Sequence, residues 1–311
     1  MHVHILDLDG SICRQHDLLA RYEPTRSDLR DWGPFLRLGC GFGRFRRFEK
    51  VVASMPDEPT VTLYGSGDFH HVSLALVRRL TEPFNLLVLD NHPDWMRGIP
   101  FLHCGTWVHH AARYPLVQRV FHLGGDVDFD NHFRWLAPWQ ALRSGRLTVF
   151  PAVRFFRGRS WERVPHFPLR PFAEGPVTAT RLDALLEPHR EELAARPLYI
   201  SLDKDVMTAD EAVVNWDSGH LHLPEVLATL AAFLDAAGGN LAGMDIVGDW
   251  SRVHTQGLMR RLLHRMEHPR QRIDAEQARL CNERTNLVLL RFLTHDPVAE
   301  GITFTARSRS A

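Results

Sequence analysis

Short runs of Leu, Val and Ile alternate along the chain with longer segments in which apolar residues recur every three to four positions. The short runs predict buried strands, and the longer segments predict amphipathic helices. The predicted strands are His4–Leu8, Thr60–Tyr64, Leu86–Leu89, Val120–Leu123, Leu147–Phe150, Leu198–Leu202, Leu241–Ile246 and Asn286–Phe292. The predicted helices are Val72–Leu80, Thr180–Ala195, Pro224–Ala236, Gln256–His268 and Ala275–Asn286. Strands alternating with helices predict a parallel sheet covered by helices on both faces.

Two segments interrupt this alternation. The segment from Pro151 to Pro176 is rich in Pro, Arg and aromatic residues and has no clear periodicity. Strands are predicted on both sides of it, so we interpret it as a surface excursion and not as a linker. The glycine-rich stretch LGCGFGRF, residues 38–45, follows no convincing strand and is predicted to be a loop. The chain, residues 1–311, is therefore predicted to form a single α/β domain.

The composition narrows the class of protein. Its 37 Lys and Arg balance 37 Asp and Glu, so net charge gives no reason to expect a nucleic-acid partner or an anionic membrane. No apolar run reaches the roughly 18–20 residues that span a bilayer, and the N-terminus lacks the pattern of a secretion signal. The four cysteines are scattered without paired spacing, as in a reduced, cytoplasmic protein. These features predict a cytoplasmic protein and give no reason to expect a nucleic-acid or membrane partner.

Candidate chemistry begins where the strand Leu86–Leu89 runs into the sequence DNHPDW. Side chains two apart on an extended segment point the same way, so Asp90, His92 and Asp94 are expected to converge. Ligands of open parallel sheets bind beyond the carboxyl ends of the strands. For one such motif alone, ordinary turn chemistry is the competing interpretation.

Two further strand ends carry the same residue types. SLDKD places Asp203 and Asp205 after an apolar run, and GSGDFHH places His70 and His71 ahead of a helix. If the three strand ends are neighbours, four carboxylates share one site and repel one another strongly. Two divalent cations would compensate that charge, and carboxylate and imidazole ligands without thiolate favour Mn²⁺ or a similar ion. Two ions about 3.5–4 Å apart can activate a bridging water.

Together, GSGDFHH, DNHPDW and SLDKD resemble the motifs GGDHS, DAHxD and SxDxD of the ureohydrolase superfamily, which contains arginase, agmatinase and formimidoylglutamase. The motifs occur in the same order, and the resemblance spans roughly Val61 to Trp250. It implies a three-layer α/β/α fold around a mostly parallel sheet of about eight strands. It also implies a binuclear manganese centre that hydrolyses a C–N bond of a guanidino, amidino or formimino group. By analogy with relatives, the chain is expected to form homo-oligomers.

Carried over residue by residue, the resemblance implies two ligand sets. One ion takes His70, Asp90, Asp94 and Asp203, and the other takes Asp90, His92, Asp203 and Asp205. GSGDFHH carries an extra residue, Phe69, between its Asp and its first His compared with GGDHS, so His71 is the alternative to His70. The hydroxide between the ions would attack the sp² carbon, with Asp205 stabilising the tetrahedral intermediate and accepting the hydroxide's proton.

Two more residues are candidates for roles beside the ions. His103, in FLHCGTW, resembles the His-Gly element that supplies a proton-shuttling histidine, and would protonate the leaving amine. The competing interpretation of His103 is a surface or packing role. Asp217, in VNWDSGH, is expected either to meet a cationic group of the substrate or to cap the helix that follows.

The sequence departs from the family where arginine would be recognised. Met96 stands where an Asn helps to hold the substrate carboxylate, and SLDKD continues to Thr208 and Ala209 in place of Asp and Pro. Gly248 occupies the position of a guanidinium-binding Glu, and Asp249 substitutes for it only if the backbone is shifted by one residue. We therefore expect a substrate other than arginine.

Three different functions compete with this one. HILDLDGSIC resembles the first motif of haloacid-dehalogenase-type phosphatases, with Asp7 as nucleophile and Asp9 as acid and base. The only two lysines, Lys50 and Lys204, offer little choice for the lysine which that family also needs, so a strand-end turn is the favoured role of the two acids. The second competing function is that of a metal-dependent amide deacetylase with the same fold class, and the third is that of a non-enzymatic relative.

Overall fold

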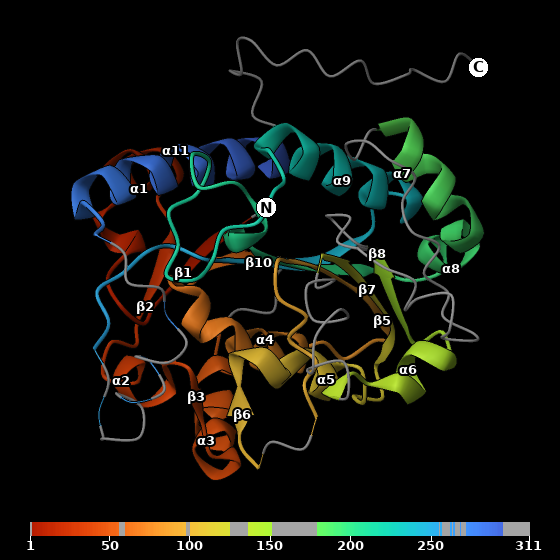
Figure 1. Cartoon of the computed structure of the whole chain (residues 1–311), viewed down its shortest axis with the longest axis horizontal. Helices are drawn as coiled ribbons and strands as arrows, with labels where there is room; N and C mark the ends of the chain where they lie inside the picture. Colours follow the sequence, from red (N-terminus) through yellow and green to blue (C-terminus); the bar gives the residue numbers. More distant parts are fainter. Residues whose placement is uncertain are drawn as a thin grey trace.

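The computed structural model describes residues 2–55, 60–97, 100–124, 136–150, 179–254, 256, 262, 264, 268 and 272–294. Its centre is an eight-stranded sheet in the order β2-β1-β4-β10-β9-β5-β7-β8, and all of its pairings are parallel (Figure 1). The strands are β1 (His2–Asp7), β2 (Thr25–Asp28), β4 (Thr60–Leu63), β5 (Phe84–Asp90), β7 (Val117–Gly124), β8 (Leu147–Phe150), β9 (Leu198–Asp203) and β10 (Leu241–Val247). The predicted sheet is confirmed.

Helices cover both faces of the sheet, which gives the predicted three layers (Figure 1). One face carries α1 (His16–Tyr22), α7 (Ala179–Leu186), α8 (Arg190–Ala194), α9 (Leu223–Ala236) and α11 (Ala275–Thr294). The other carries α2 (Gly33–Leu36), α3 (Phe42–Val52), α4 (Ser73–Val77), α5 (Trp107–Ala111) and α6 (Trp139–Arg143). On this second side a short antiparallel pair joins β3 (Gly39–Cys40) to β6 (Leu102–His103).

The alternating side chains of the central strands fill two hydrophobic cores, one on each face. In β5, Leu87 and Leu89 pack into the core beneath α9, whereas Leu86 and Val88 pack into the core with α4 and α5. All seven residues of β5 are buried. A strand covered on both faces reads as a continuous apolar run, which explains why its polar end stood out in the sequence.

Several predicted elements were wrong in detail. The predicted strand Asn286–Phe292 lies inside α11, where the buried Leu289, Leu290 and Leu293 recur at helical spacing. The predicted loop over residues 38–45 contains β3 and the beginning of α3. The predicted helix Val72–Leu80 is shorter, because a 3₁₀ helix, Gly67–Val72, precedes α4.

Other predictions were divided or lie elsewhere. Thr180–Ala195 is split into α7 and α8 by a 3₁₀ turn that contains Pro188, which has no N–H for a helical hydrogen bond. The segment from Pro151 to Pro176 lies outside the described residues, as does most of the predicted helix Gln256–His268. Of the helices that the structure describes, none has both the length and the apolar character to cross a membrane.

Candidate metal centre

The three motifs meet at one edge of the sheet. β5 and β9 are neighbours, and β4 is separated from β9 by β10 alone. All of these strands are parallel, so the segments that follow them leave from the same edge. The residues predicted from the three motifs therefore lie in one region.

The segment after β5 converges by bending. β5 ends at Asp90, and the backbone N–H of His92 donates to Asp90 Oδ1 at 2.6 Å. Asp94 has a φ of +49°, a left-handed conformation that is uncommon for a residue other than Gly. Trp107 holds it there, because its indole N–H donates to Asp94 Oδ2 at 2.9 Å. The side chains meet as expected, but the extended segment assumed in the sequence argument ends at Asp90.

The 3₁₀ helix Gly67–Val72 brings His70 to these acids. Its Nδ1 lies 2.9 Å from Asp90 Oδ2, 3.0 Å from Asp94 Oδ2 and 3.6 Å from Asp203 Oδ2. The ring of His71, the alternative ligand, lies beside Phe45 with 6.3 Å between ring centroids. The extra residue of GSGDFHH is thus accommodated by the tight helical turn, which directs the first of the two histidines at the acids.

SLDKD supplies the other two carboxylates. Asp205 Oδ2 lies 2.8 Å from His92 Nδ1, and Asp203 Oδ1 accepts the backbone N–H of Asp205 at 3.0 Å. Asp203 sits between two glycines: a Cβ on Gly67 would lie 2.6 Å from Oδ2, and a Cβ on Gly248 would lie 2.5 Å from Oδ1. The lack of side chains at these two positions makes the space that the carboxylate occupies.

The charges of this cluster do not balance. Four carboxylates face two imidazoles, which leaves two negative charges within the cluster even when both rings are protonated. Burial and then Asp94 raise the pKa of Asp90 to about 6, and burial and then Asp90 raise the pKa of Asp205 to about 6. Burial and the Asp205 charge hold the pKa of Asp203 well above its usual range. The carboxylates therefore resist ionisation without a cation.

The two imidazoles respond in the opposite way. Burial lowers the pKa of His70, but hydrogen bonds with Asp90 and Asp94 outweigh it and hold that pKa well above its usual value. Burial also lowers the pKa of His92, and the charge of Asp205 outweighs it and raises the pKa to about 10. Both shifts show an excess of negative charge in the cluster.

The arrangement fits metal ions. Two groups, His70–Asp90–Asp203 and Asp90–His92–Asp205, each offer ligand atoms within 4.8 Å of one another, and they share Asp90. His70 Nδ1 has one proton for three carboxylate oxygens within 3.6 Å, whereas a cation can bind them all. Shared carboxylates between adjacent groups are the arrangement that a two-ion site requires.

A second layer of hydrogen bonds, missed in the sequence, supports His70. Its Nε2 lies 3.0 Å from Ser201 Oγ, which in turn donates to Asp245 Oδ1 at 2.8 Å. The fully buried Asp245 also accepts the hydroxyls of Tyr64 and Tyr199 at 3.0 and 2.9 Å. An acid inside the buried strand β10, in GMDIVGDW, was the available signal.

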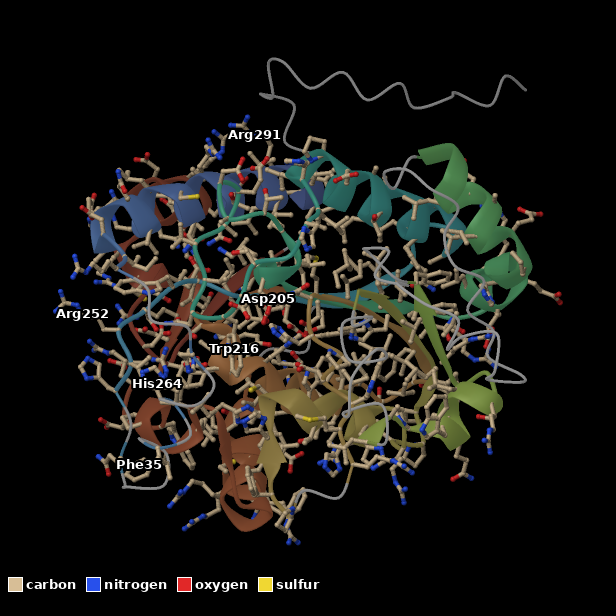
Figure 2. The ribbon with its side chains drawn as sticks, in the orientation of Figure 1. Phe35, Asp205, Trp216, Arg252, His264 and Arg291 are labelled. Atoms are coloured by element: carbon tan, nitrogen blue, oxygen red, sulfur yellow. The ribbon has the colours of Figure 1, made fainter. Side chains whose placement is uncertain are left out.

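A cavity of about 260 Å³ opens above the cluster. The described residues that line it are Gly67, Asp90, His92, Pro93, Asp94, Met96, His103, Cys104, Gly105, Asp203, Asp205 and Trp216. Two of these lining residues, Asp205 and Trp216, are labelled in Figure 2. His103 is one of these lining residues, and its Nδ1 accepts the backbone N–H of Gly105 at 3.0 Å.

The predicted substrate-binding acids lie elsewhere. Asp217 is exposed, and its carbonyl accepts from the side chain of Asn91 at 3.3 Å. Asp249 is buried, with Oδ2 lying 2.8 Å from Nζ of the fully buried Lys204. The side chain of Gln15 also donates to Asp249, at 2.6 Å. Neither acid is among the described residues that line the cavity.

The N-terminal acids form the expected strand-end turn. Asp7 is the last residue of β1, and its carboxylate pairs with Arg26. Asp9 accepts the hydroxyl of Ser11 at 2.6 Å and the backbone N–H of Ser66 at 3.1 Å. Both carboxylates therefore have structural partners.

Comparisons with known proteins give a consistent result for the fold. No family model matches the sequence. An uncharacterized protein of Thermotoga maritima is 24% identical over 229 residues, which cover 74% of this chain and 73% of that protein.

Solved structures resemble the chain over most of its length. The proclavaminate amidino hydrolase of Streptomyces clavuligerus has a TM-score of 0.51 and 16% identity, and covers 91% of this chain and 92% of its own. Bacillus subtilis arginase has a TM-score of 0.52 and 12% identity, with 96% and 100% coverage. Bacillus subtilis formimidoylglutamase has a TM-score of 0.52 and 13% identity, with 95% and 87% coverage. The chain therefore has the fold of arginase and its ureohydrolase relatives, as its three motifs predicted.

Proposed function

We propose that the protein is a divergent ureohydrolase that holds two Mn²⁺ ions and cleaves a C–N bond of a guanidino, amidino or formimino compound other than arginine. The observation that carries the proposal is the pair of ligand groups that share Asp90 at the base of one cavity. The solved structures with this fold include an amidino hydrolase, an arginase and a formimidoylglutamase, which supports the substrate class.

The donor atoms support manganese. The two groups contain carboxylate oxygens and imidazole nitrogens, and the nearby Cys104 belongs to neither. Such ligands suit Mn²⁺ better than a structural zinc. In our assignment, one ion takes His70, Asp90, Asp94 and Asp203, and the other takes Asp90, His92, Asp203 and Asp205. Each ion would offset charge that the cluster leaves uncompensated.

The chain's own residues supply the remaining chemistry. When bound, the two ions supply a hydroxide near neutral pH and positive charge for the negative charge that develops at the reacting carbon. Asp205 accepts the proton that the nucleophile releases. Because His103 Nδ1 accepts a backbone N–H, the neutral ring carries its proton on Nε2. As the C–N bond breaks, the protonated form of His103 would give a proton to the departing nitrogen and become neutral, so that a neutral amine leaves.

The decisive test measures metal content and turnover together. Protein loaded with Mn²⁺ should bind two ions per chain and release ammonia or urea from at least one member of a guanidino, amidino and formimino panel. Acetylamino and phosphate-ester compounds in the same panel test the deacetylase and phosphatase functions. If none of the compounds yielded a product, the proposal would be overturned.

Neighbouring histidines provide a matched pair of variants. His70→Asn should lower the manganese content and abolish turnover, whereas His71→Asn should retain both in its folded fraction. Equal losses in the two variants would contradict the assignment of His70 as the ligand.

A further inference from the structure

The cavity above the acidic cluster has a wall of a different chemical character. Apart from the proposed metal ligands and His103, the described lining residues are Gly67, Pro93, Met96, Cys104, Gly105 and Trp216. None of these carries a charge. From this wall we infer that the substrate presents an uncharged, apolar group next to its scissile amidino or guanidino carbon. The inference rests on the proposed function and narrows its substrate class.

Trp216 offers the cavity only aromatic carbon. Its one polar atom, the indole N–H, donates to Asp68 Oδ1 at 3.0 Å. The fully buried Asp68 is itself held by the guanidinium of Arg37, whose Nε lies 2.6 Å from Oδ2. This buried ion pair fixes the indole and satisfies its donor, so the ring can stabilise a ligand through apolar and stacking contacts.

Met96 forms another part of the wall and packs against a glycine. Its Cε lies 2.6 Å from the position that a Cβ on Gly105 would take. The backbone N–H of Met96 donates to the carbonyl of Gly105 at 3.0 Å, which fixes the loop beside His103. A flexible thioether at this position can adapt to an alkyl or aryl group, but cannot bind a carboxylate or an ammonium group by charge.

Asp249, which follows the end of β10, is not among the described residues that line the cavity. Gly248 has a φ of +99°, and any side chain there would collide with Asp203 and with the backbone of Lys204. The carboxylate of the next residue, Asp249, forms an ion pair with the ammonium group of Lys204. A cationic substrate tail would therefore gain no acidic partner from this strand.

The size of the cavity limits the ligand. At about 260 Å³ it is smaller than the 300–1,000 Å³ of typical drug-sized sites, so we expect a compact compound. Hydrolysis would break one C–N bond, add the oxygen of water to the carbon and release the nitrogen as an amine or ammonia. The apolar group stays against Trp216 and Met96 throughout.

Matched ligands test the inference by binding, independently of turnover. n-Butylguanidine and 4-aminobutylguanidine share a head group and a chain and differ in a terminal ammonium. Calorimetric titration of the manganese-loaded protein should show at least tenfold tighter binding of n-butylguanidine. Lengthening an alkylguanidine from methyl to propyl should improve affinity about fourfold for each buried methylene.

Two variants at one position connect the preference to the wall. Met96 is half-buried, so substitution should leave the protein folded. Met96→Asn should weaken n-butylguanidine about tenfold and narrow the gap to the amino compound. Met96→Leu keeps the apolar volume and should retain the wild-type preference.

The outcomes separate this inference from the proposed function. Tighter binding of n-butylguanidine supports the inference. If the protein shows this preference but hydrolyses no compound, only the hydrolase proposal fails. Equal or tighter binding of 4-aminobutylguanidine overturns the inference, and accompanying turnover would leave the hydrolase proposal intact. Failure of both guanidines to bind overturns the inference as well.

Discussion

Two buried clusters of charge lie next to each other in the motif SLDKD, and only one of them has balanced charges. Asp203 and Asp205 join a cluster with four carboxylates and two imidazoles. Lys204, between them, forms an ion pair with Asp249. The side chains of Gln15 and Asn286 also donate to that carboxylate, at 2.6 and 3.3 Å.

The difference shows which cluster has its buried charges compensated by the protein's own side chains. Buried charges are stable when they are paired with an opposite charge and supported by hydrogen bonds. Lys204 and Asp249 are paired, and Gln15 adds a hydrogen bond to the Asp249 carboxylate. Two other buried acids also have partners: Asp68 is paired with Arg37, and Asp245 accepts hydrogen bonds from hydroxyl groups. The cluster around Asp90 departs from the rule, and it does so below a cavity. We interpret the imbalance as the charge that two cations would neutralise.

The largest expected effect comes from breaking the balanced pair. Lys204→Met would leave the Asp249 carboxylate buried without a cation, which typically costs about 3–5 kcal/mol of folding free energy. Urea unfolding of the metal-free protein, followed by tryptophan fluorescence, measures the loss. Lys50→Met is the control, because this second lysine is exposed and should change stability by less than about 0.5 kcal/mol.

A double variant completes this test. Lys204→Met combined with Asp249→Leu removes both charges and should recover much of the lost stability. If Lys204→Met were as mild as Lys50→Met, the ion pair would not be a structural element and the contrast between the clusters would fail.

The same kind of substitution in the unbalanced cluster should act in the opposite direction. Asp203→Asn keeps an acceptor for the backbone N–H of Asp205 but removes a carboxylate that burial and Asp205 destabilise. The metal-free variant should therefore melt roughly 2–4 °C above the wild type, about 1 kcal/mol. Its manganese affinity should fall more than about 100-fold, beyond the usual effect of a residue that only supports a ligand.

Thermal melts with and without Mn²⁺ measure both effects. Asp183→Asn, at an exposed side chain of α7, is the matched control and should change neither quantity appreciably. A metal-free Asp203→Asn protein that melts below the wild type would show that this carboxylate stabilises the fold.

Local patterns in the sequence predicted the sheet and the meeting of the three motifs. Buried runs such as that of β5 need no distant information, because apolar residues on both faces mark a covered parallel strand. The positions of Asp90 and Asp203 could also be predicted locally, because these acids end the apolar runs that form β5 and β9. Asp94 shows the limit of such local prediction. Its side chain reaches the cluster because its own backbone is left-handed, and the alternation of residues in the sequence does not predict this conformation.

The features that were missed depend on partners far away in the sequence. Asn286–Phe292 is apolar enough for a strand, and only its packing in α11 decides for a helix. The pairing of Lys204 with Asp249 spans two motifs, and neither residue indicates its partner. Asp245 likewise acquires its role from Ser201 and Tyr199 on β9 and from Tyr64, which follows β4.

Asp245 offers a smaller effect that links the two kinds of cluster. It is well provided with donors, yet through Ser201 it orients the proposed ligand His70. Asp245→Asn should weaken manganese binding by about 10–100-fold while leaving the six proposed ligands in place. ¹⁵N spectra of His70 should show a changed tautomer population, which a general loss of stability would not produce. Unchanged affinity and spectra would exclude this positioning role.

The smallest expected effect per step is a dependence of metal binding on pH. The pKa of Asp90 and that of Asp205 are raised from an ordinary 3.8 to about 6, and that of His92 is raised from 6.5 to about 10. The folded, metal-free protein therefore holds more protons than the unfolded chain, so these groups contribute stability at low pH that is lost as the pH rises from about 4 to about 10. Bound cations displace those protons, so manganese affinity should rise with pH by about tenfold per unit for each proton released. Melts at pH 5, 6, 7 and 8 should show a manganese-induced increase in melting temperature that grows with pH, whereas a cluster already balanced without metal would give the same increase at every pH.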